Sequence, residues 1–396
     1  MRLAAAICGV LALGCVATAG FVSRHELRYS VELHRDGTCV GCHAANHPGL
    51  VADWKASPHF TAGVSCADCH GESHEAVIAA RGAVDAAVCA RCHADAARSF
   101  ATSAHAHAQD GIEKTSLFQA APEAVQRAAC APCHDIGRPG SDGFRGRCAD
   151  CHGGHRFSAA AARSPEACTP CHDGPDRPET AAWRESPHGA QYRQFGPGQA
   201  PACADCHMGG AGGHGDTPIL TLSHGRQGTV LEGELAVPPS PTLSRAEFAT
   251  RRAATIALCR RCHAQDLAER SLAEADAVKR EADRPLSEAA ELVRRLFADG
   301  LLRPMPQERR PDPVAGHALA PGESYTETSA IEQRFFELSR MAHAATVRGA
   351  YHQAPGVLHW QGFAAEQAAL TFIRDEARRL RAAAGPAVAP TVRTAP

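Results

Sequence analysis

Sixteen of the 18 cysteines in this chain of 396 residues belong to one repeated pattern, Cys-x-x-Cys-His. The pattern occurs eight times, beginning at Cys39, Cys66, Cys89, Cys130, Cys148, Cys168, Cys203 and Cys259. The second cysteines are Cys42, Cys69, Cys92, Cys133, Cys151, Cys171, Cys206 and Cys262. The histidines that close the motifs are His43, His70, His93, His134, His152, His172, His207 and His263. The other two cysteines, Cys8 and Cys15, lie in an apolar N-terminal stretch.

Each motif predicts the covalent attachment of one c-type haem. Two thiols separated by two residues reach the two vinyl groups of one porphyrin, and the adjoining histidine coordinates its iron. Zinc ribbons would use paired Cys-x-x-Cys units without an obligatory histidine. A disulfide framework gives no reason for a histidine after every second cysteine. The sequence therefore predicts a cytochrome with eight covalently bound c-type haems as its cofactors.

The composition fits a core that is packed with haem. Only 5% of the residues are aromatic, so the large apolar porphyrins must supply much of the interior. Covalent attachment also fixes loops rich in glycine, alanine and proline that bury little surface themselves. The formal net charge of -2 argues against a nucleic-acid partner, which requires a basic surface. We expect a mainly α fold with an octahaem domain over residues 23–263 that conducts electrons between closely packed haems.

The chain changes character after residue 263. Apolar residues recur at helical spacing over 286–297, 330–349 and 363–380. Pro285 and a proline-rich run at 304–313 are expected to interrupt these helices. We predict long helices in a C-terminal domain, residues 264–383, that packs on the haems, followed by a disordered tail at 384–396. Strands are hardly indicated anywhere.

The N-terminal 22 residues are typical of an export signal. Arg2 precedes an uncharged apolar stretch, and Ala17-Thr18-Ala19 forms a small-x-small cleavage site. The alternative is an uncleaved membrane anchor, because about 20 apolar residues can just span a bilayer. Lipid attachment at Cys15 is less favoured, since the preceding residues match a lipobox poorly. Each interpretation places the chain from about Ser23 in the periplasm or otherwise outside the cytoplasm.

Histidines are the expected sixth ligands of most irons, because methionines are few. Haems with a histidine on both sides of the iron have lower reduction potentials than haems with one histidine and one methionine. Trp54-Lys-Ala-Ser-Pro-His59 is repeated as Trp183-Arg-Glu-Ser-Pro-His188, with each histidine 16 residues after a motif histidine. Ser103-Ala-His105 is a looser copy, and a second pattern places a histidine shortly after a motif. The predicted distal ligands are His47, His59, His74, His105, His155, His188, His214 and His352.

One stretch of the sequence carries a family resemblance. From Cys148 it contains Cys-Ala-Asp-Cys-His-Gly-Gly-His-Arg-Phe-Ser, then Ala-Arg-Ser-Pro-Glu-Ala-Cys, then His172-Asp-Gly-Pro-Asp176. Ser186-Pro-His-Gly189 and Cys203-Ala-Asp-Cys-His-Met208 continue it. The chain resembles octahaem hydroxylamine oxidoreductases from Cys39 to about Phe363, although it is shorter than typical members. Over its last five haems it is more distantly similar to pentahaem ammonia-forming nitrite reductases.

The resemblance implies that the fourth haem, held by Cys130, Cys133 and His134, is catalytic and open on its distal face. In the family, an Asp-His pair within Gly-Pro-Asp-His-Pro lines this pocket. The corresponding residues here are Asp176 and Arg177. Asp176 is a candidate proton donor or acceptor. Arg177 can stabilise an anion such as nitrite but cannot shuttle protons near neutral pH. The alternative is that both residues belong to an ordinary surface loop.

A second difference from the family pattern concerns the direction of the reaction. Oxidising members of the family link a tyrosine just ahead of a His-Trp pair to the catalytic haem of a neighbouring subunit. The stretch before His359-Trp360 has no tyrosine, and Tyr351 supplies one only if the alignment slips. Without this link, the resemblance favours reduction.

The resemblance thus implies a periplasmic enzyme that reduces nitrite or hydroxylamine to ammonium at the fourth haem. A cytochrome or a quinol-linked carrier is the expected electron donor, and the family's homotrimer is a further expectation. Oxidation of hydroxylamine stays open, as does a non-catalytic electron conduit with two histidines on every iron. Tetrathionate reduction is less favoured, because the related enzymes replace one motif histidine by lysine.

Overall fold

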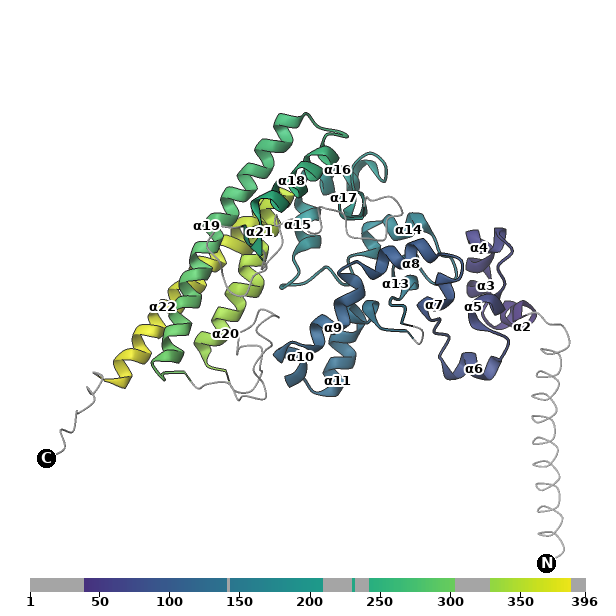
Figure 1. Cartoon of the computed structure of the whole chain (residues 1–396), viewed down its shortest axis with the longest axis horizontal. Coiled ribbons are helices and arrows are strands. Elements are labelled where there is room, and N and C mark those ends of the chain that lie inside the picture. The colour runs from purple at the N-terminus through teal and green to yellow at the C-terminus, as the bar shows by residue number, and fades with distance from the viewer. Residues whose placement is uncertain (1–38, 141–142, 209–229, 232–241, 303–327, 386–396) are drawn as a thin grey trace, which may run out of the picture. The chain divides into compact units, whose positions relative to one another are not determined.

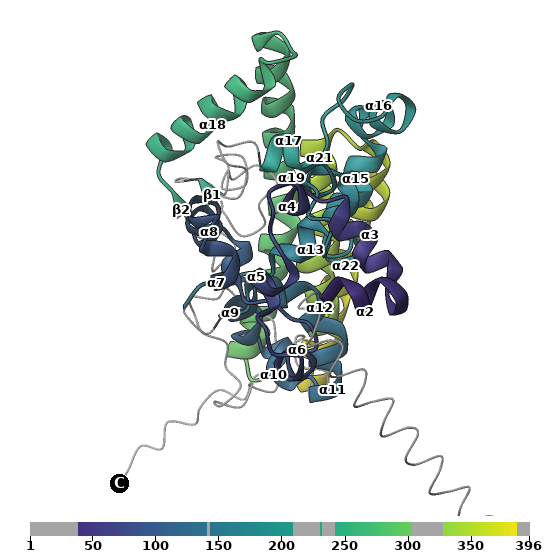
Figure 2. The same cartoon turned by 90° about the vertical axis from the view of Figure 1, so that its right-hand side faces the viewer.

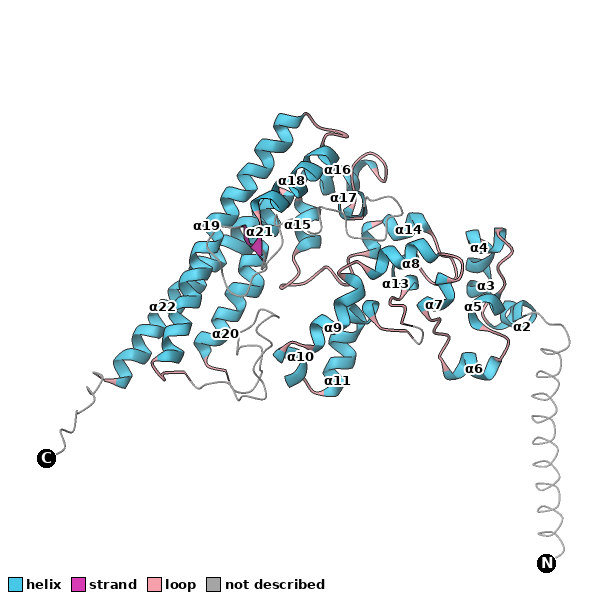
Figure 3. Cartoon of the chain, viewed as in Figure 1, coloured by secondary structure: helices cyan, strands magenta, loops and turns pink. Residues whose placement is uncertain are grey.

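The computed structural model describes residues 39–140, 143–208, 230–231, 242–302 and 328–385. These residues divide into two compact units. The first unit holds the described residues up to Val84 together with His152–Ser158, and the second unit holds the rest. Helix dominates both units (Figure 3), which confirms the prediction of a mainly α fold. The domain boundaries expected after residues 22, 263 and 383 stay predictions.

The first unit is built from short helices (Figure 1). They are α2 (Cys39–Asn46), α3 (Pro48–Lys55), α4 (Pro58–Thr61), α5 (Cys66–His70) and α6 (His74–Ala79). Serine side chains start three of them: the Oγ atoms of Ser57, Ser65 and Ser73 accept hydrogen bonds from backbone N–H groups of the first turn. Helices of this length are not stable alone in water, so the unit depends on what its motifs hold.

The second unit begins with further short elements. They are α7 (Ala86–Ala90), α8 (Ala94–Ala101), η1 (His105–His107), α9 (Ala108–Glu113), α10 (Ser116–Ala120), α11 (Glu123–Val125), η2 (Gln126–Cys130), α12 (Ala131–His134), η3 (Asp135–Gly137), α13 (Cys148–His152), α14 (Ala159–Arg163), η4 (Pro165–Ala167), α15 (Glu179–Glu185), α16 (Pro187–Phe195) and α17 (Cys203–His207). Helix α13 ends at His152, where the chain enters the segment that belongs to the first unit. The described strands, β1 (Val230–Leu231) and β2 (Thr242–Leu243), form one parallel pair.

Longer helices follow. They are α18 (Arg245–Cys259), α19 (Gln265–Ala298), α20 (Ala330–Glu337), the π-helical segment η8 (Leu338–Ala342), α21 (His343–His352), the π-helical segment η9 (Val357–Phe363) and α22 (Ala364–Ala384). Figure 2 shows α18 rising to the start of α19, and Figure 1 shows α19 and α22 side by side. The expected long C-terminal helices are therefore confirmed.

An apolar core joins α19, α20, η8 and α22. Its fully buried side chains include Val293, Leu296, Ile331, Leu338 and Ile373. Burying each side chain of this kind contributes about 1.5–3 kcal/mol. These are the residues whose helical spacing marks the amphipathic face in the sequence, so periodicity and packing agree here.

Pro285 does not interrupt a helix, contrary to expectation. It lies inside α19, which runs without a break from Gln265 to Ala298. A proline inside a helix removes one hydrogen bond and costs about 3 kcal/mol. Helix α19 buries side chains on both sides of this point, from Ala275 to Leu296, and this packing outweighs the local cost.

Charged side chains are buried beneath α21. Asp283 of α19 accepts hydrogen bonds from Lys279 Nζ at 2.7 Å and contacts His343 Nε2 at 2.9 Å. The Thr346 hydroxyl donates to Glu366 Oε1 at 2.6 Å, and the Glu366 side chain is fully buried. Burial raises the pKa of Glu366 to about 8, so this carboxyl group is mostly protonated at neutral pH.

Within the described ranges, no helix has the length and apolarity needed to cross a membrane. The predicted signal peptide or anchor at residues 1–22 lies outside these ranges, as do the proline-rich run at 304–313 and most of the predicted tail.

Candidate functional site

Several Cys-x-x-Cys-His motifs form single helical turns, whereas the histidines of the motifs beginning at Cys89, Cys168 and Cys259 lie outside the helices. In α5, α13 and α17 the sequence Cys-Ala-Asp-Cys-His coincides with the whole helix. Residues three and four positions apart lie on one helix face, so two thiols and an imidazole can meet one bound group. The central aspartate caps two of these turns: Asp68 Oδ2 accepts from Ser65 N at 2.7 Å and Asp205 Oδ2 from Ala202 N at 2.9 Å.

Thiols from different motifs lie against one another. In the first unit the Cys39 thiol lies close to the Cys66 thiol and contributes, after burial, to raising its pKa. In the second unit Cys89 lies close to Cys148, Cys171 to Cys133, and Cys168 to Cys203. The fold therefore brings the third motif to the fifth and the fourth motif to the sixth, although neither pair is consecutive in the sequence.

Five motif histidines each face a second imidazole. The ring centroids are 6.2 Å apart for His43 and His74, 6.0 Å for His70 and His155, 6.0 Å for His105 and His172, 5.8 Å for His188 and His263, and 6.3 Å for His207 and His352. Two imidazoles bonded at about 2 Å to opposite sides of one metal ion have centroids about 6 Å apart. The five pairs thus fit an iron between the rings.

Burial favours the neutral form of several of these imidazoles, the form that binds a metal. Burial lowers the pKa of His207 to about 4, with a further contribution from His352. Burial also lowers the pKa of His70, of His172 and of His188. His155 has a φ of 40°, a left-handed conformation that is unfavourable for a residue with a side chain and is often found at functional sites.

The tryptophan-to-histidine repeat of the sequence is also a structural repeat. Ser57 Oγ donates to Trp54 O at 2.6 Å and accepts from Phe60 N, while Ser186 Oγ donates to Trp183 O at 2.7 Å and accepts from Gly189 N. In both copies the serine caps a helix whose first residue is proline and whose second is the predicted ligand. The repeat gives His59 and His188 the same local frame.

Other predicted ligands have different surroundings. His47 Nδ1 lies 3.2 Å from His43 Nδ1, a direct contact that leaves no room for an iron between these atoms. His59 packs edge-on against the Phe157 ring, with centroids 4.9 Å apart. His93 precedes α8 and His152 ends α13. His214 lies outside the described residues.

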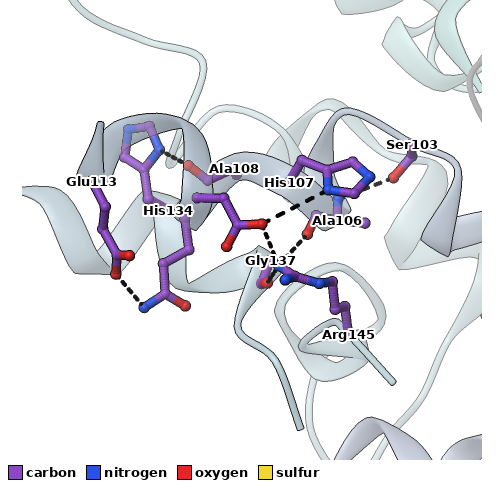
Figure 4. Close-up of polar contacts among 10 residues, drawn as sticks. Ser103, Ala106, His107, Ala108, Glu113, His134, Gly137 and Arg145 are labelled. Carbon is purple, nitrogen blue, oxygen red and sulfur yellow. Dashed lines mark hydrogen bonds and ion pairs between the residues drawn. The ribbon is translucent and has the colours of Figure 1, made fainter. Parts of the chain in front are cut away.

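His134, the histidine of the fourth motif, is held by a backbone acceptor (Figure 4). Its Nδ1–H donates to the carbonyl oxygen of Ala108 at 3.0 Å. This bond fixes the tautomer and leaves Nε2 free to bind a metal. Burial lowers the pKa of His134. Unlike the five paired motif histidines, His134 faces no second imidazole among the residues that the structure describes.

Side-chain contacts hold the start of α9, at Ala108, in place. Arg145 Nη1 pairs with Asp110 Oδ2 at 3.0 Å and donates to the carbonyl oxygens of Ala106 and Gly137 at 3.2 and 3.3 Å (Figure 4). A Cβ atom on Gly137 would lie 2.5 Å from the carbonyl oxygen of His105, so only glycine fits. Sequence analysis did not identify Ala108 or Arg145, because a backbone acceptor and a distant arginine leave no motif.

Asp176 and Arg177 lie beside the fourth motif. They stand in a turn in which Arg177 N donates to Gly174 O at 3.1 Å, with a proline in the second position that favours such a turn. The charge of Arg177 lowers the pKa of His134, while that of Asp176 raises it, so both act on this ring. Arg177 Nε is buried and, among the described residues, has no hydrogen-bond partner. The fold thus brings the three predicted catalytic residues together.

The Tyr351 side chain is hydrogen-bonded within its own chain. Its hydroxyl donates to Asp276, whose two carboxylate oxygens accept from Arg252 Nη2 at 2.7 and 2.8 Å. Burial and the charge of Asp276 raise the pKa of Tyr351 well above its ordinary value. The phenol is therefore largely buried and hydrogen-bonded within its own chain.

Comparison with known proteins shows the family and the fold of the chain. Residues 62–311 match the family model "Seven times multi-haem cytochrome CxxCH", and residues 17–71 match the model for cytochrome c554 and c-prime. The probable nitrite reductase-hydroxylamine oxidoreductase fusion protein of Kuenenia stuttgartiensis is 27% identical over 454 residues. That alignment covers 88% of this chain and 52% of the relative, so the chain spans about half of the relative's length.

Solved structures share the fold. A chain of the reducing HAO-like protein complex of Kuenenia stuttgartiensis superposes with a TM-score of 0.72 at 24% identity, covering 90% of this chain and 87% of that one. A hypothetical multiheme protein gives a TM-score of 0.68 at 18% identity, covering 88% of this chain and 96% of that one. The family match extends over more than half of the sequence and over seven of the motifs. The chain belongs to the multihaem cytochromes c, and its Cys-x-x-Cys-His motifs bind c-type haem covalently.

Proposed function

We propose that the chain holds eight c-type haems, one at each Cys-x-x-Cys-His motif. The motif histidines are the proximal ligands, and five irons have a histidine on both sides. The distal ligands of these five are His74 for His43, His155 for His70, His105 for His172, His188 for His263 and His352 for His207. His47 supports His43 by direct contact instead of ligating an iron. His59 and His214 are kept as candidate ligands, with no haem assigned to either.

We propose that the protein is an octahaem reductase of nitrite or hydroxylamine, related to the hydroxylamine oxidoreductases. The single observation that carries this proposal is the surroundings of His134. The charges of Arg177 and Asp176 act on the pKa of His134, which faces no second imidazole among the described residues, whereas the five paired motif histidines each face one. A haem bound here supplies an iron position for the substrate and the electrons for its reduction.

The chain's own residues bind the substrate and move protons. Arg177 Nε is buried, makes no hydrogen bond among the described residues and lies 3.6 Å from Asp176 Oδ1, so its N–H can be offered to an anion, which suits nitrite. Asp176, about half exposed, exchanges protons with solvent and delivers them to the bound nitrogen oxide. Reduction of nitrite to ammonium consumes six electrons and eight protons and releases two waters, so a proton-donating carboxyl group beside the site is needed.

The engagement of Tyr351 supports the reductive direction. Its hydroxyl is bonded to Asp276 within the same chain, and the stretch ahead of His359 has no other tyrosine. Hydroxylamine oxidation by the family's route requires a tyrosine that reaches another subunit. The paired histidines would hold haems that supply electrons from a redox partner, a cytochrome or a quinol-linked carrier.

Multihaem c-type cytochromes are typically extracytoplasmic, and we place this chain in the periplasm, with residues 1–22 as its signal peptide or anchor. A homotrimer remains part of the proposal.

Turnover with a reduced artificial donor tests the proposed reaction. Asp176→Asn keeps the size of the side chain but removes its proton, and we expect nitrite and hydroxylamine reduction to fall by about 10²–10⁴-fold. Asp173→Asn is the matched control, because Asp173 lies in the same segment and pairs only loosely with Arg184, at 3.5 Å on the surface. Full activity of Asp176→Asn would remove this residue from the mechanism.

A further inference from the structure

An ion pair lies among the histidines of two motifs in the second unit. Arg348 Nε donates to Glu179 Oε1 at 3.0 Å, and the two side chains are 15% and 29% exposed. Burial raises the pKa of Glu179, but the charge and hydrogen bond of Arg348 lower it further, so the carboxylate stays ionised. The pair therefore keeps both of its charges in a largely dry environment.

Both partners have hydrogen-bonding capacity left over. Arg348 Nη1 and Glu179 Oε2 are buried and, among the residues described, have no hydrogen-bond partner. Burying a polar group without a partner costs about 1–3 kcal/mol, and more when the group is charged. Native proteins rarely leave such a group unmatched, so a bound group or an ordered water must complete the site.

The Arg348–Glu179 pair lies close to imidazoles that are proposed to ligate a haem. Arg348 stands one helical turn before His352, and its carbonyl oxygen accepts from His352 Nδ1 at 2.9 Å. The charges of Arg348 and Glu179 both act on His207, on His352 and on His172. A haem between His207 and His352 carries two propionate groups, and these are the carboxylates available to a guanidinium group here.

We propose that Arg348, positioned by Glu179, binds a propionate of the haem ligated by His207 and His352 and so sets the reduction potential of that haem. This inference rests on the proposed ligation, not on the proposed reaction. Guanidinium suits the role because its planar fork can donate to Glu179 through Nε and to a second carboxylate through Nη1 at once. Its positive charge favours the reduced haem, and the Glu179 carboxylate offsets part of that effect.

Potentiometric titration of the purified holoprotein separates a charge effect from a packing effect. Arg348→Met should lower the potential of the haem between His207 and His352 more than that of any other haem, and Glu179→Gln should raise the potential of the same haem. The double variant should return close to the wild-type value. Shifts of the same sign in both single variants, or no shift with full haem content, would overturn the proposal. Arg374→Met is the control, because Arg374 forms an exposed ion pair with Glu288 away from the motifs.

Infrared difference spectroscopy tests the propionate contact itself, using protein whose haem carboxyl groups carry ¹³C. Arg348→Lys keeps the positive charge but loses the fork, so we expect one labelled carboxylate band to shift relative to wild type. An unchanged set of labelled bands would mean that only water completes the site. His352→Ala tests the underlying ligation separately: it should remove one low-spin signal, and its failure to do so would overturn both the ligation and this inference.

Discussion

The Nδ1 atom of His134 donates to the carbonyl oxygen of Ala108 at 3.0 Å. This bond joins the fourth motif to the start of α9, which the Arg145–Asp110 ion pair fixes in turn. A histidine oriented in this way presents Nε2 to a metal before any ligand arrives. The nearby charges belong to Asp176 and Arg177, and this combination separates the fourth motif from the five with facing imidazoles.

Replacing Arg177 should weaken the binding of anionic nitrite but not that of uncharged hydroxylamine. Arg177→Met removes a charge-assisted hydrogen bond, worth about 1.5–3 kcal/mol, and should raise the KM for nitrite about 10- to 100-fold. The KM for uncharged hydroxylamine should change little. Arg177→Lys should recover part of the loss, and Arg184→Met, in the same segment but exposed, should behave as wild type. Equal effects on both substrates would contradict anion binding by Arg177.

The angles between facing imidazoles predict different magnetic signatures. The ring planes of His105 and His172 are 82° apart, whereas those of His70 and His155 are 24° apart. Near-parallel rings interact with the same iron orbital and split the electronic levels, while perpendicular rings leave two levels nearly equal. EPR of the oxidised protein should therefore show a highly anisotropic signal that His105→Ala abolishes and a rhombic signal that His155→Ala abolishes. The reverse assignment would contradict the pairing.

Gly362 should resist substitution because η9 and α21 approach closely there. A Cβ atom on Gly362 would overlap the backbone nitrogen and side chain of Thr346. Overpacking of this kind costs about 1–3 kcal/mol, so Gly362→Ala should lower the Tm by a few degrees. Gly49→Ala is the control, since nothing lies within 4 Å of the added atom and the site is helical. Equal Tm values for the two variants would argue against the close approach.

Glu366 should make stability depend on pH. Its pKa in the folded protein, about 8, is above that of the unfolded chain, so the folded state holds one more proton between the two values. Unfolding free energy should fall as pH rises from about 5 to 8, by up to about 1.4 kcal/mol per unit, and level off above that. In Glu366→Gln the side-chain oxygen can still accept a hydrogen bond from Thr346. This variant should be more stable than wild type only at the upper end of this pH range. Thermal melts of wild type and Glu366→Gln across this pH range measure the difference in Tm. A difference that stays constant with pH would contradict the predicted role of Glu366.

The haem-attachment pattern and the long helices could be predicted because their signals are local. The motif of five residues forms one helical turn in α5, α13 and α17, and Val293, Leu296 and Ile373 mark their helix faces by spacing alone. The repeat that contains His59 and His188 is also local, since a serine cap and a following proline specify its backbone.

Pairings across the fold could not be predicted. Which imidazole faces His70 depends on a residue 85 positions later, His155, and no spacing rule connects them. The uninterrupted course of α19 through Pro285 depends on packing that outweighs local preference. Arg348 and Glu179 carry no motif, so only the structure shows their proximity to three predicted ligands.

The spin state of the fourth haem tests the central claim most directly. EPR and optical spectra of the oxidised holoprotein, recorded with and without nitrite and hydroxylamine, should show one high-spin haem in eight, whose signal changes when either substrate is added. His134→Ala should remove this signal, whereas Asp176→Asn should retain it. If every haem is low-spin and indifferent to both substrates, the fourth haem is closed, and the protein conducts electrons without reducing a nitrogen oxide.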